Sequence, residues 1–339
     1  MELEIIQQEL VLRSPFRIAH SVVTSVDMLW VHIARDGVVG HGEIHPIPYF
    51  GESTGSARTD CMRAFAEYRL ELSTASSADN LFNVTREMLN RGLSRAAVSG
   101  LEMALLDTLA KLRSQPLHAL LELPAPGLVR IATTVPIGVD PEAVLRGTRG
   151  SLLKLKVDSD TADGVLRFCA EHPELELILD VNGGWSLEQL VRHAGELMLP
   201  QIVVLEEPLD RLLARETELL KQLHGSHPIF LDESARYLGQ MLVHEPYVSG
   251  FNVKLAKVGG IGEALRIARC FRGTRKLMLG CFIESSLAIA AAYQLSAAFD
   301  YVDLDGHTFL ADDPYRGLSL VHGELSLHEN SYGIGVSHA

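Results

Sequence analysis

The sequence contains little that suits a secreted or membrane-bound protein. Only four of its 339 residues are cysteines, and they show no paired spacing, so we expect reduced thiols and no disulfide framework. No apolar run approaches the roughly 18 residues of a membrane helix. The first residues, Met-Glu-Leu-Glu-Ile-Ile, lack the basic start and apolar core of a signal peptide. We therefore expect a cytoplasmic protein without a membrane partner.

Basic residues are also scarce. The chain has 30 Lys and Arg against 43 Asp and Glu, a formal net charge of −13. Because no basic cluster is dense enough to bind phosphates, we expect no nucleic-acid partner. The 47% apolar and 22% charged content is typical of a globular protein, and the length allows one or two domains.

The first 122 residues place strands before helices, which is the order of an α+β domain. The expected strands are Glu2–Arg13, Met28–Arg35 and Val38–Ile44, and the expected helices are Ser56–Leu72, Leu81–Asn90 and Arg95–Arg113. The last residues, about 318–339, return to short strand-like segments. We expect them to complete the first domain.

Residues 123–317 alternate short apolar runs with helical patterns. The expected strands are Ile131–Pro136, Leu152–Val157, Leu177–Val181, Ile202–Leu205, Ile229–Leu231, Gly250–Val253, Lys276–Leu279 and Tyr301–Leu304. The expected helices between them include Ala162–Glu171, Ser186–Leu197, Leu212–Leu223 and Gly262–Phe271. This alternation predicts an α/β fold, a (β/α)7β barrel related to the TIM barrel, whose parallel strands all end at one mouth.

Five polar residues follow successive apolar runs of this pattern. They are Lys156, Asp180, Glu206, Asp232 and Lys254. Consecutive members are about 25 residues apart, which is the length of one strand, one helix and two loops. We therefore expect all five side chains to meet at the mouth of the barrel.

The three acids of this set suit a hard divalent cation. A single such acid is usually a helix cap or a surface charge, but Asp180, Glu206 and Asp232 end three consecutive expected strands. Three carboxylates in one place suit Mg²⁺, and no His or Cys stands at a matching strand end to favour a softer metal. We expect one Mg²⁺ per subunit.

The two lysines end the second and sixth expected strands, so they should face each other across the mouth. One amine can remove a proton from one face of a carbon while the other returns a proton to the opposite face. A lysine base needs a lowered pKa near neutral pH, and neighbouring cations, including Lys154, would lower it. Lys154 could equally bind a substrate oxygen. With a cation beside them, these lysines predict proton abstraction next to a carboxylate.

The motifs around these residues resemble the enolase superfamily, in its muconate-lactonizing subgroup. They are Lys-Leu-Lys at 154–156, Asp180-Val-Asn182, Glu206-Glu-Pro208, Asp232-Glu-Ser234 and Asn252-Val-Lys254, with Gly40-His-Gly-Glu43, Gly51-Glu-Ser-Thr54 and the segment from Ala97 to Lys111 in the first domain. The resemblance implies a capping domain at 1–122 and a barrel with Asp180, Glu206 and Asp232 as metal ligands. It further implies Lys156 and Lys254 as acid/base catalysts, supported by Asn182 and Glu207.

The segment Asp303-Leu-Asp305 resembles the Asp-x-Asp of dipeptide epimerases, which holds the substrate's α-ammonium group. Both carboxylates lie on one face of a strand, although paired acids could also cap the following turn. The implied activity is Mg²⁺-dependent epimerisation of the C-terminal residue of an L-Ala-L-Xaa dipeptide by two-base proton transfer. The implied substrate contacts are Asp303, Asp305, Lys154, Thr134, Phe282 and Ile283.

The resemblance also implies that capping-domain loops at Arg17–Thr24 and Ile47–Glu52 close over the mouth. Arg17 and His20 could meet the substrate or be ordinary loop charges. Ala256 departs from some epimerases of the family, which have an acid there, and the adjacent Lys257 reads as structural. A homo-oligomer is compatible with a barrel that carries an added domain.

Three alternative functions remain at this point. The same proton abstraction could serve an o-succinylbenzoate synthase or a muconate cycloisomerase, but their substrates carry no ammonium group for Asp303 and Asp305. A Schiff-base aldolase would use a lysine without a metal. A barrel that only binds a metal or a peptide would not need lysines on both faces.

Overall fold

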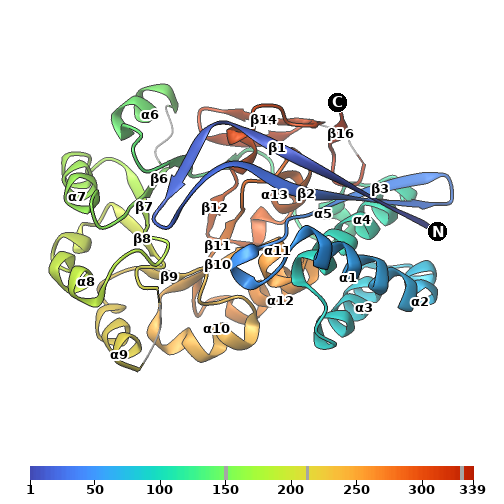
Figure 1. The fold of residues 1–339 in the computed structure, drawn as a ribbon, viewed down its shortest axis with the longest axis horizontal. Helices are drawn as coiled ribbons and strands as arrows, with labels where there is room; N and C mark the ends of the chain where they lie inside the picture. The colour runs from blue at the N-terminus through green and yellow to red at the C-terminus, as the bar shows by residue number, and fades with distance from the viewer. Residues whose placement is uncertain (149–151, 211–213, 329–331) are drawn as a thin grey trace.

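The computed structural model describes residues 1–148, 152–210, 214–328 and 332–339. It contains a sheet of eight parallel strands with helices around it, and a three-stranded antiparallel sheet that carries its own helices. Figure 1 shows the long strands of the antiparallel sheet reaching across the parallel sheet. In the described ranges, no helix is long and apolar enough to cross a membrane.

The parallel sheet confirms the barrel expectation. Its strands, in chain order and spatial order alike, are β5 (Thr133–Val135), β6 (Leu152–Lys156), β7 (Glu176–Asp180), β8 (Ile202–Glu206), β9 (Ile229–Leu231), β10 (Gly250–Lys254), β11 (Lys276–Gly280) and β12 (Tyr301–Asp303). A backbone hydrogen bond of 2.8 Å from Ala132 N to Val302 O joins the first strand region to the last. The sheet is therefore nearly closed, and every strand ends on one side.

Helices surround this barrel. The α-helices are α6 (Pro141–Thr148), α7 (Ala162–Glu171), α8 (Leu187–His193), α9 (Ala214–Leu223), α10 (Leu238–His244), α11 (Leu255–Val258), α12 (Ile261–Phe271) and α13 (Ser286–Tyr293). Short 3-10 helices lie at Glu196–Met198, Glu245–Tyr247, Ser296–Ala298 and Gly306–Phe309. The helix expected from Leu212 is present from Ala214, and its first expected residues lie outside the described residues. Ser186 caps α8 as part of a capping box with Gln189.

Strand alternation explains what lies inside the barrel. An apolar cluster plugs its lower part: Ala132, Leu152, Ile178, Val204, Phe230 and Met278. Two residues further along its strand, each of these positions is followed by another inward-facing residue, as Lys154 follows Leu152 and Asp180 follows Ile178. The period of two thus places polar side chains directly above an apolar floor.

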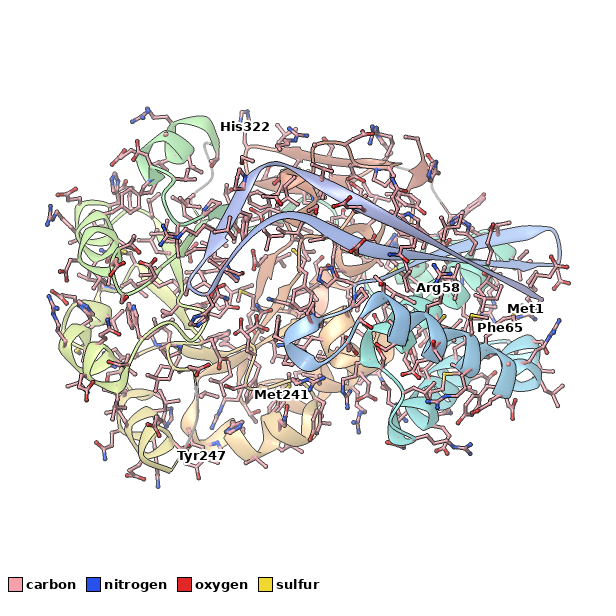
Figure 2. The ribbon with its side chains drawn as sticks, in the orientation of Figure 1. Met1, Arg58, Phe65, Met241, Tyr247 and His322 are labelled. Atoms are coloured by element: carbon pink, nitrogen blue, oxygen red, sulfur yellow. The ribbon has the colours of Figure 1, made fainter. Side chains whose placement is uncertain are left out.

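The first domain is built on an antiparallel sheet of β1 (Glu2–Ile18), β2 (Ser21–Arg35) and β3 (Val38–Ile44). Its helices are α1 (Thr54–Glu67), α2 (Arg69–Thr74), α3 (Ala78–Asn90), α4 (Arg95–Leu112) and α5 (Leu117–Leu120), with a 3-10 helix at Pro48–Phe50. Arg58 of α1 points to β1, where its Nη1 donates to Ile5 O at 2.9 Å (Figure 2). The helix expected over Ser56–Leu72 is divided at Tyr68.

Two glycines of β3 let α4 lie directly on the sheet. A Cβ at Gly40 would stand 2.2 Å from Ala104 O, and one at Gly42 would stand 2.0 Å from Gly100 O. Both distances are far below van der Waals contact. The motif Gly40-His-Gly-Glu43 is thus a docking surface for the longest helix of this domain.

The expected loop over Arg17–Thr24 is instead the tip of the β1–β2 hairpin. The strands run to Ile18 and restart at Ser21, which leaves only a two-residue turn. β-branched residues such as Ile18, Val22 and Val23 favour this extended form. The hairpin is attached to the barrel by hydrogen bonds from Ile137 N to Arg17 O at 3.2 Å and from Ala311 N to Val11 O at 2.8 Å.

The end of the chain contacts both parts of the molecule. The strands β14 (Leu318–Val321) and β15 (Glu324–Leu327) form a sheet with β4 (Val129–Arg130), and β13 (Tyr315–Arg316) pairs with β16 (Ser337–His338). Gly333 N donates to Gln115 O at 2.9 Å, and Ile334 N donates to Asp107 Oδ1 at 2.8 Å. Residues 333–334 therefore lie against the first domain, at α4 and the loop after it.

Candidate active site

The structure brings the five strand-end residues together at the mouth of the barrel. Lys156 Nζ lies 2.6 Å from Asp180 Oδ2, and Lys254 Nζ lies 2.5 Å from Asp232 Oδ2. Asp180 and Glu206 are paired in register across β7 and β8. Lys156 on β6 and Lys254 on β10 stand on opposite sides of the barrel, with β7, β8 and β9 between them.

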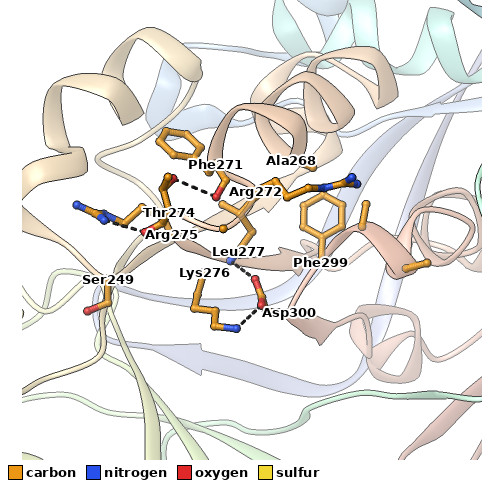
Figure 3. A pocket seen from close by; sticks show the side chains of 13 residues that line it. Ser249, Ala268, Phe271, Arg272, Thr274, Arg275, Lys276, Leu277, Phe299 and Asp300 are labelled. Atoms are coloured by element: carbon orange, nitrogen blue, oxygen red, sulfur yellow. Dashed lines mark hydrogen bonds and ion pairs between the residues drawn. The ribbon is translucent and has the colours of Figure 1, made fainter.

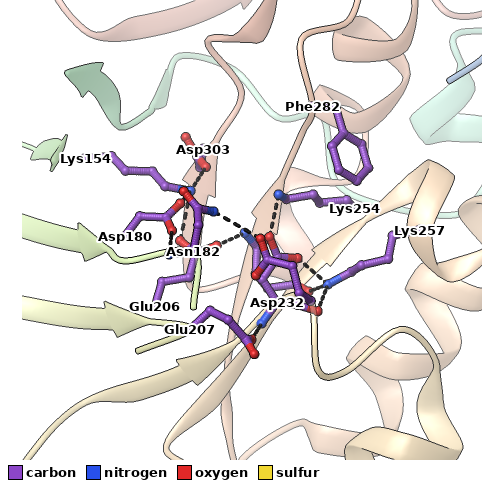
Figure 4. Close-up of polar contacts among 12 residues, drawn as sticks. Lys154, Asp180, Asn182, Glu206, Glu207, Asp232, Lys254, Lys257, Phe282 and Asp303 are labelled. Atoms are coloured by element: carbon purple, nitrogen blue, oxygen red, sulfur yellow. Dashed lines mark hydrogen bonds and ion pairs between the residues drawn. The ribbon is translucent and has the colours of Figure 1, made fainter. Parts of the chain in front are cut away.

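Lys154 occupies the centre of this arrangement. Its Nζ lies 2.8 Å from Asp180 Oδ2, 2.9 Å from Glu206 Oε2 and 2.7 Å from Asp303 Oδ2, and the side chain is buried (Figure 4). Burial lowers the pKa of its amine, but the three carboxylates outweigh burial and raise that pKa well above its ordinary value. Lys154 is therefore a fixed positive charge among the acids.

The three expected metal ligands are fully buried. Burial, and then the charge of Asp180, raise the pKa of Glu206 to about 7, although Lys154 opposes them. For Asp180 and Asp232, burial opposes ionisation, but the adjacent lysines outweigh it and lower both pKa values. At this mouth, neighbouring cations therefore stabilise the ionised form of these buried carboxylates.

The residues fit a hard cation by their chemistry. In the described ranges, no three His, Cys, Asp or Glu side chains are arranged to hold a metal ion, and Asp180, Glu206 and Asp232 contact lysine amines. Their carboxylate oxygens are nevertheless hard donors at three consecutive strand ends, as Mg²⁺ prefers. The raised pKa of Glu206 is what a further cation beside it would relieve.

Asn182 and Glu207 support the acids through unusual backbone conformations. Both have positive φ, 46° and 37°, directly after their strands. Asn182 N donates to Asp180 Oδ1 at 3.1 Å, and Glu207 Oε2 accepts from Asp232 N at 2.7 Å. A left-handed Glu is uncommon, so this local strain is held by the contacts around the site.

Lys257 has a role that the sequence did not show. Its side chain has no exposed surface, and its Nζ donates to Asp232 O at 2.7 Å and to Asn252 O at 2.7 Å, with a further ion pair of 2.5 Å to Asp232 Oδ1. It is structural, as expected, but its specific task is to hold Asp232. The spacing of three residues after Lys254, across a single helical turn, is the signal that could have shown this.

Lys254 lies against an aromatic wall. Its Nζ is 4.6 Å from the ring centroid of Phe282, and the His45 ring is stacked on the same ring with centroids 4.8 Å apart. Burial lowers the pKa of Lys254, but Asp232 outweighs burial and raises it well above its ordinary value. The lowered lysine pKa expected from the sequence is absent here because the charge of Asp232 outweighs both burial and the nearby Lys154 cation.

Asp303 and Asp305 have different partners. Asp303 is paired with Lys154, whereas Asp305 Oδ2 accepts from Thr134 N at 2.6 Å and Asp305 Oδ1 accepts from Thr134 Oγ1 at 3.0 Å. Burial, and then the charge of Asp303, raise the pKa of Asp305 to about 7. The two acids therefore stand together at the eighth strand, and Asp305 is joined to the first.

A cavity of about 440 Å³ opens above these groups. Its lining includes Thr134, Lys154, Lys156, Asn182, Lys254, Phe282, Ile283, Asp303 and Asp305, all named from the sequence. It also includes Phe16, Ile18 and Val23 of the hairpin, Tyr49, and Phe309 after β12. The alternation of Phe16 with Ile18 and of Ser21 with Val23 is the sequence signal for this apolar roof.

A second large cavity, of about 550 Å³, lies where β10 and β11 begin, away from the mouth (Figure 3). Two cations of its lining are paired within the protein: Lys276 Nζ lies 2.5 Å from Asp300 Oδ1, and Arg275 Nη2 lies 3.0 Å from Glu245 Oε1. Barrel enzymes place their chemistry at the opposite end of the strands. The mouth is therefore the candidate active site.

Comparison with known proteins agrees with this geometry. Residues 144–337 match the family described as enolase C-terminal domain-like, and residues 1–122 match the mandelate racemase / muconate lactonizing enzyme N-terminal domain. The hydrophobic dipeptide epimerase of Roseobacter litoralis is 34% identical over 346 residues, covering 96% of each chain.

Solved structures agree as well. The dipeptide epimerase of Methylococcus capsulatus, complexed with Mg and L-Arg-D-Lys, is 28% identical with a TM-score of 0.84 and 99% coverage of both chains. That of Enterococcus faecalis, complexed with Mg and L-Leu-L-Tyr, is 26% identical with a TM-score of 0.85 and the same coverage. With both of its parts matched, the chain belongs to the mandelate racemase/muconate lactonizing enzyme family of the enolase superfamily.

Proposed function

We propose that this protein is a dipeptide epimerase that inverts Cα of the C-terminal residue. The observation that carries the proposal is the placement of two lysine amines on opposite sides of one cavity, Lys156 from β6 and Lys254 from β10. An amine on each side can exchange the Cα proton on both faces, which is what inversion requires. Relatives described as dipeptide epimerases support it.

We assign Asp303 and Asp305 to the α-ammonium group of the dipeptide. Both are buried, they lie beside each other at the cavity, and their substrate partner would be a charge-assisted hydrogen-bond donor. Thr134 holds Asp305 in place through two hydrogen bonds. Substrates of synthases or cycloisomerases, which carry no ammonium group, would leave these acids without a use.

We assign Asp180, Glu206 and Asp232 as the ligands of one Mg²⁺ per subunit. When bound, this ion stabilises the negative charge that develops on the substrate carboxylate as the proton leaves. Lys154 keeps the acids ionised from inside the site, while Asn182, Glu207 and Lys257 orient them. The Mg found with dipeptides in the two related structures supports the choice of ion.

We propose that the substrate side chains are apolar. Phe16, Ile18, Val23 and Phe309 line the roof of the cavity, and Arg17 at the hairpin tip is turned to Asp158, 3.2 Å away. The three lysines of the cavity are each paired with an acid, so no cation remains to receive an acidic side chain among the described lining residues. The substrate of the Roseobacter litoralis relative, a hydrophobic dipeptide, agrees with this lining.

The remaining assignments also belong to this proposal. The capping domain comprises residues 1–122, completed by about 318–339, and the barrel comprises residues 123–317. All four cysteines are free, which supports a reducing, cytoplasmic location. A homo-oligomer stays part of the proposal, and light scattering on the purified protein tests it.

The experiment is a proton-exchange screen in D₂O with Mg²⁺ and a library of L,L-dipeptides. Mass spectrometry should show one deuterium entering Cα of the C-terminal residue, with L-Ala-L-Phe-like dipeptides faster than L-Ala-L-Glu. Asp303→Asn/Asp305→Asn should abolish dipeptide turnover. The absence of exchange with every dipeptide would contradict the proposal, and cycloisomerase activity that survives the double substitution would favour the alternative.

A further inference from the structure

The segment Ile47–Glu52 of the capping domain forms one wall of the cavity. It contains the 3-10 helix Pro48–Phe50, whose Pro48 and Tyr49 line the cavity above the lysines. Tyr49 is 57% exposed, so it stands at the boundary between the cavity and solvent. Whatever fixes this segment therefore fixes the width of the entrance.

The base of the segment is anchored within its own domain. Glu52 Oε2 accepts from Ile47 N at 3.1 Å, which closes the segment into a loop. Glu52 Oε1 accepts from Ser94 Oγ at 2.7 Å, at the start of α4. These bonds hold the two ends of the loop, but they leave its tip to other contacts.

The ring contact between the tip and the described part of the barrel is a stack on Arg236. The guanidinium carbon of Arg236 lies 3.7 Å from the ring centroid of Phe50, and the Phe50 ring meets the Tyr49 ring at 4.4 Å. In the described part of the chain, no hydrogen bond or ion pair joins residues 48–50 to the barrel. The stack of Arg236 on Phe50, and of Phe50 on Tyr49, therefore links the position of Tyr49 to the barrel.

Arg236 is itself committed to this stack. Its Nε is buried and has no hydrogen-bond partner within the described ranges, whereas its backbone N donates to Gln240 Oε1 at 2.8 Å. It lies in the loop after β9, which begins with Asp232. The residue as a whole is only partly buried, but an enclosed Nε without a polar partner is costly, so the place of the guanidinium over an aromatic ring indicates a task there.

The surroundings leave room for the tip to move. Phe50 and Arg236 both border a hollow of about 360 Å³, which is also lined by Gly51, Ser94 and Arg95. Gly51 has φ 82°, a conformation that glycine adopts freely, so the segment can turn at this residue. If the Phe50 ring left Arg236, it could move toward this hollow without entering a packed core.

We propose that Arg236 is a positioning residue: by stacking on Phe50 it latches the segment Ile47–Glu52 over the cavity and so places Tyr49 against the substrate. This inference rests on the proposed function for its kinetic consequence but not for its structural one. Arg236 touches none of the reacting groups, so the latch acts on substrate capture and release and leaves the proton-transfer step alone.

The test compares Arg236→Met, Phe50→Leu and the double variant with the parent protein. Each single change should raise KM about 3- to 30-fold with kcat within about twofold, the range that one cation–π contact commands. The double variant should be no worse than the poorer single variant, because both remove one interaction. Additive effects, or an unchanged KM, would overturn the latch.

A structural readout separates the latch from turnover. Amide hydrogen exchange of residues 47–52, measured without substrate, should be faster in Arg236→Met, while α4 and the barrel strands keep their protection. If the parent protein exchanges no substrate proton, the proposed function fails, and this measurement still decides the latch. Equal exchange in parent and variant overturns the latch even when the enzyme is active.

Two further variants control for folding and for loss of a domain contact. Arg86→Met removes another arginine that joins the two domains: Arg86 of α3 forms a 3.2 Å ion pair with Glu263 of α12, and no ring contact joins it to Phe50 within the described residues. It should leave KM unchanged, and a rise equal to that of Arg236→Met would contradict a local latch. Arg236→Lys keeps the charge but lacks the planar group, and its KM should fall between those of the parent and Arg236→Met.

Discussion

Individual residues at this site have properties set by where each strand ends. Alternation along β6 brings Lys154 and Lys156 to the inner face above Leu152. Lys154 lies 2.7 Å from Asp303, whereas Lys156 contacts Asp180 and Asn182 at the edge of the cavity. The two lysines, although only two positions apart on one strand, therefore have different roles.

We predict that Lys156→Met and Lys254→Met each lower kcat for epimerisation by about 10²–10⁴-fold, the usual contribution of a positioned acid or base. Each variant should keep proton exchange with one enantiomer of the C-terminal residue and lose it with the other, since one face still has its amine. Deuterium incorporation from L,L and L,D dipeptides measures this.

The exposed Lys221→Met is the matched control and should leave both rates unchanged. If each lysine variant lost exchange with both enantiomers equally, the assignment of one amine to each face would be wrong.

Much of this site was predictable because its signals are local. The strand ends and the Asp303–Asp305 alternation each show within a few residues, and the carboxylates recur about every 25 residues, at the pitch of the strand–helix repeat, so the pattern predicts them. Lys257, which holds Asp232, and Arg236, which stacks on Phe50, depend on contacts between distant segments. The ion pairs of Lys154 also need the closed barrel, because its partners come from β7, β8 and β12.

At the scale of elements, the contact between α4 and β3 shows how a short motif directs packing. The sequence predicts both elements from their periodicities, but it does not show that glycines make them touch. Gly40 and Gly42 alternate on one face of β3, and Gly100 stands on the facing side of α4. The hairpin tip was the opposite case: the resemblance implied a loop over Arg17–Thr24, whereas the strands run to Ile18, restart at Ser21 and contact the barrel.

We predict that Gly42→Ala lowers the free energy of unfolding by about 1–3 kcal/mol, because its Cβ would overlap the backbone of α4. Chemical denaturation followed by circular dichroism measures the change. Gly195→Ala, at a site with no atom within 4 Å of the added Cβ, should change stability by less than about 0.5 kcal/mol. Equal effects at the two sites would mean that the close approach is relaxed by movement of the helix.

For the whole molecule, buried acids of the capping domain bind the ends of barrel helices. Glu43 of β3 accepts from Ser285 N at 3.1 Å, at the start of α13, and Glu102 of α4 accepts from Gly262 N at 2.9 Å, in the first turn of α12. Burial raises the pKa of Glu43 to about 8 and that of Glu102 to about 7. The two parts are thus joined by contacts that respond to pH.

We predict that Tm falls as the pH rises from 5 to 8, in part because of Glu43. Its folded pKa of about 8 lies above the ordinary 4.5, so its contribution to stability is complete below about pH 4.5 and is lost as the pH rises through 8. Glu284 and Asp313 face the same group and act in the same direction. Glu43→Gln should reduce the fall by about 2–4 °C, measured by differential scanning calorimetry.

The exposed Glu324→Gln is the control and should leave the pH slope as in the parent protein. A slope that Glu43→Gln leaves unaltered would show that this carboxyl is ionised without cost in the folded state.

The hairpin of β1 and β2 has a consequence for how such a protein can change. Its tip, residues 16–23, supplies apolar roof positions, whereas the acids and amines that line the cavity come from the barrel strands and the loops that follow them. The residues expected to set substrate preference and the residues expected to carry out the proton transfer are therefore separate in the sequence. Exchanging only this short stretch with that of a relative should transfer preference for a new dipeptide while the inversion step continues at its former speed.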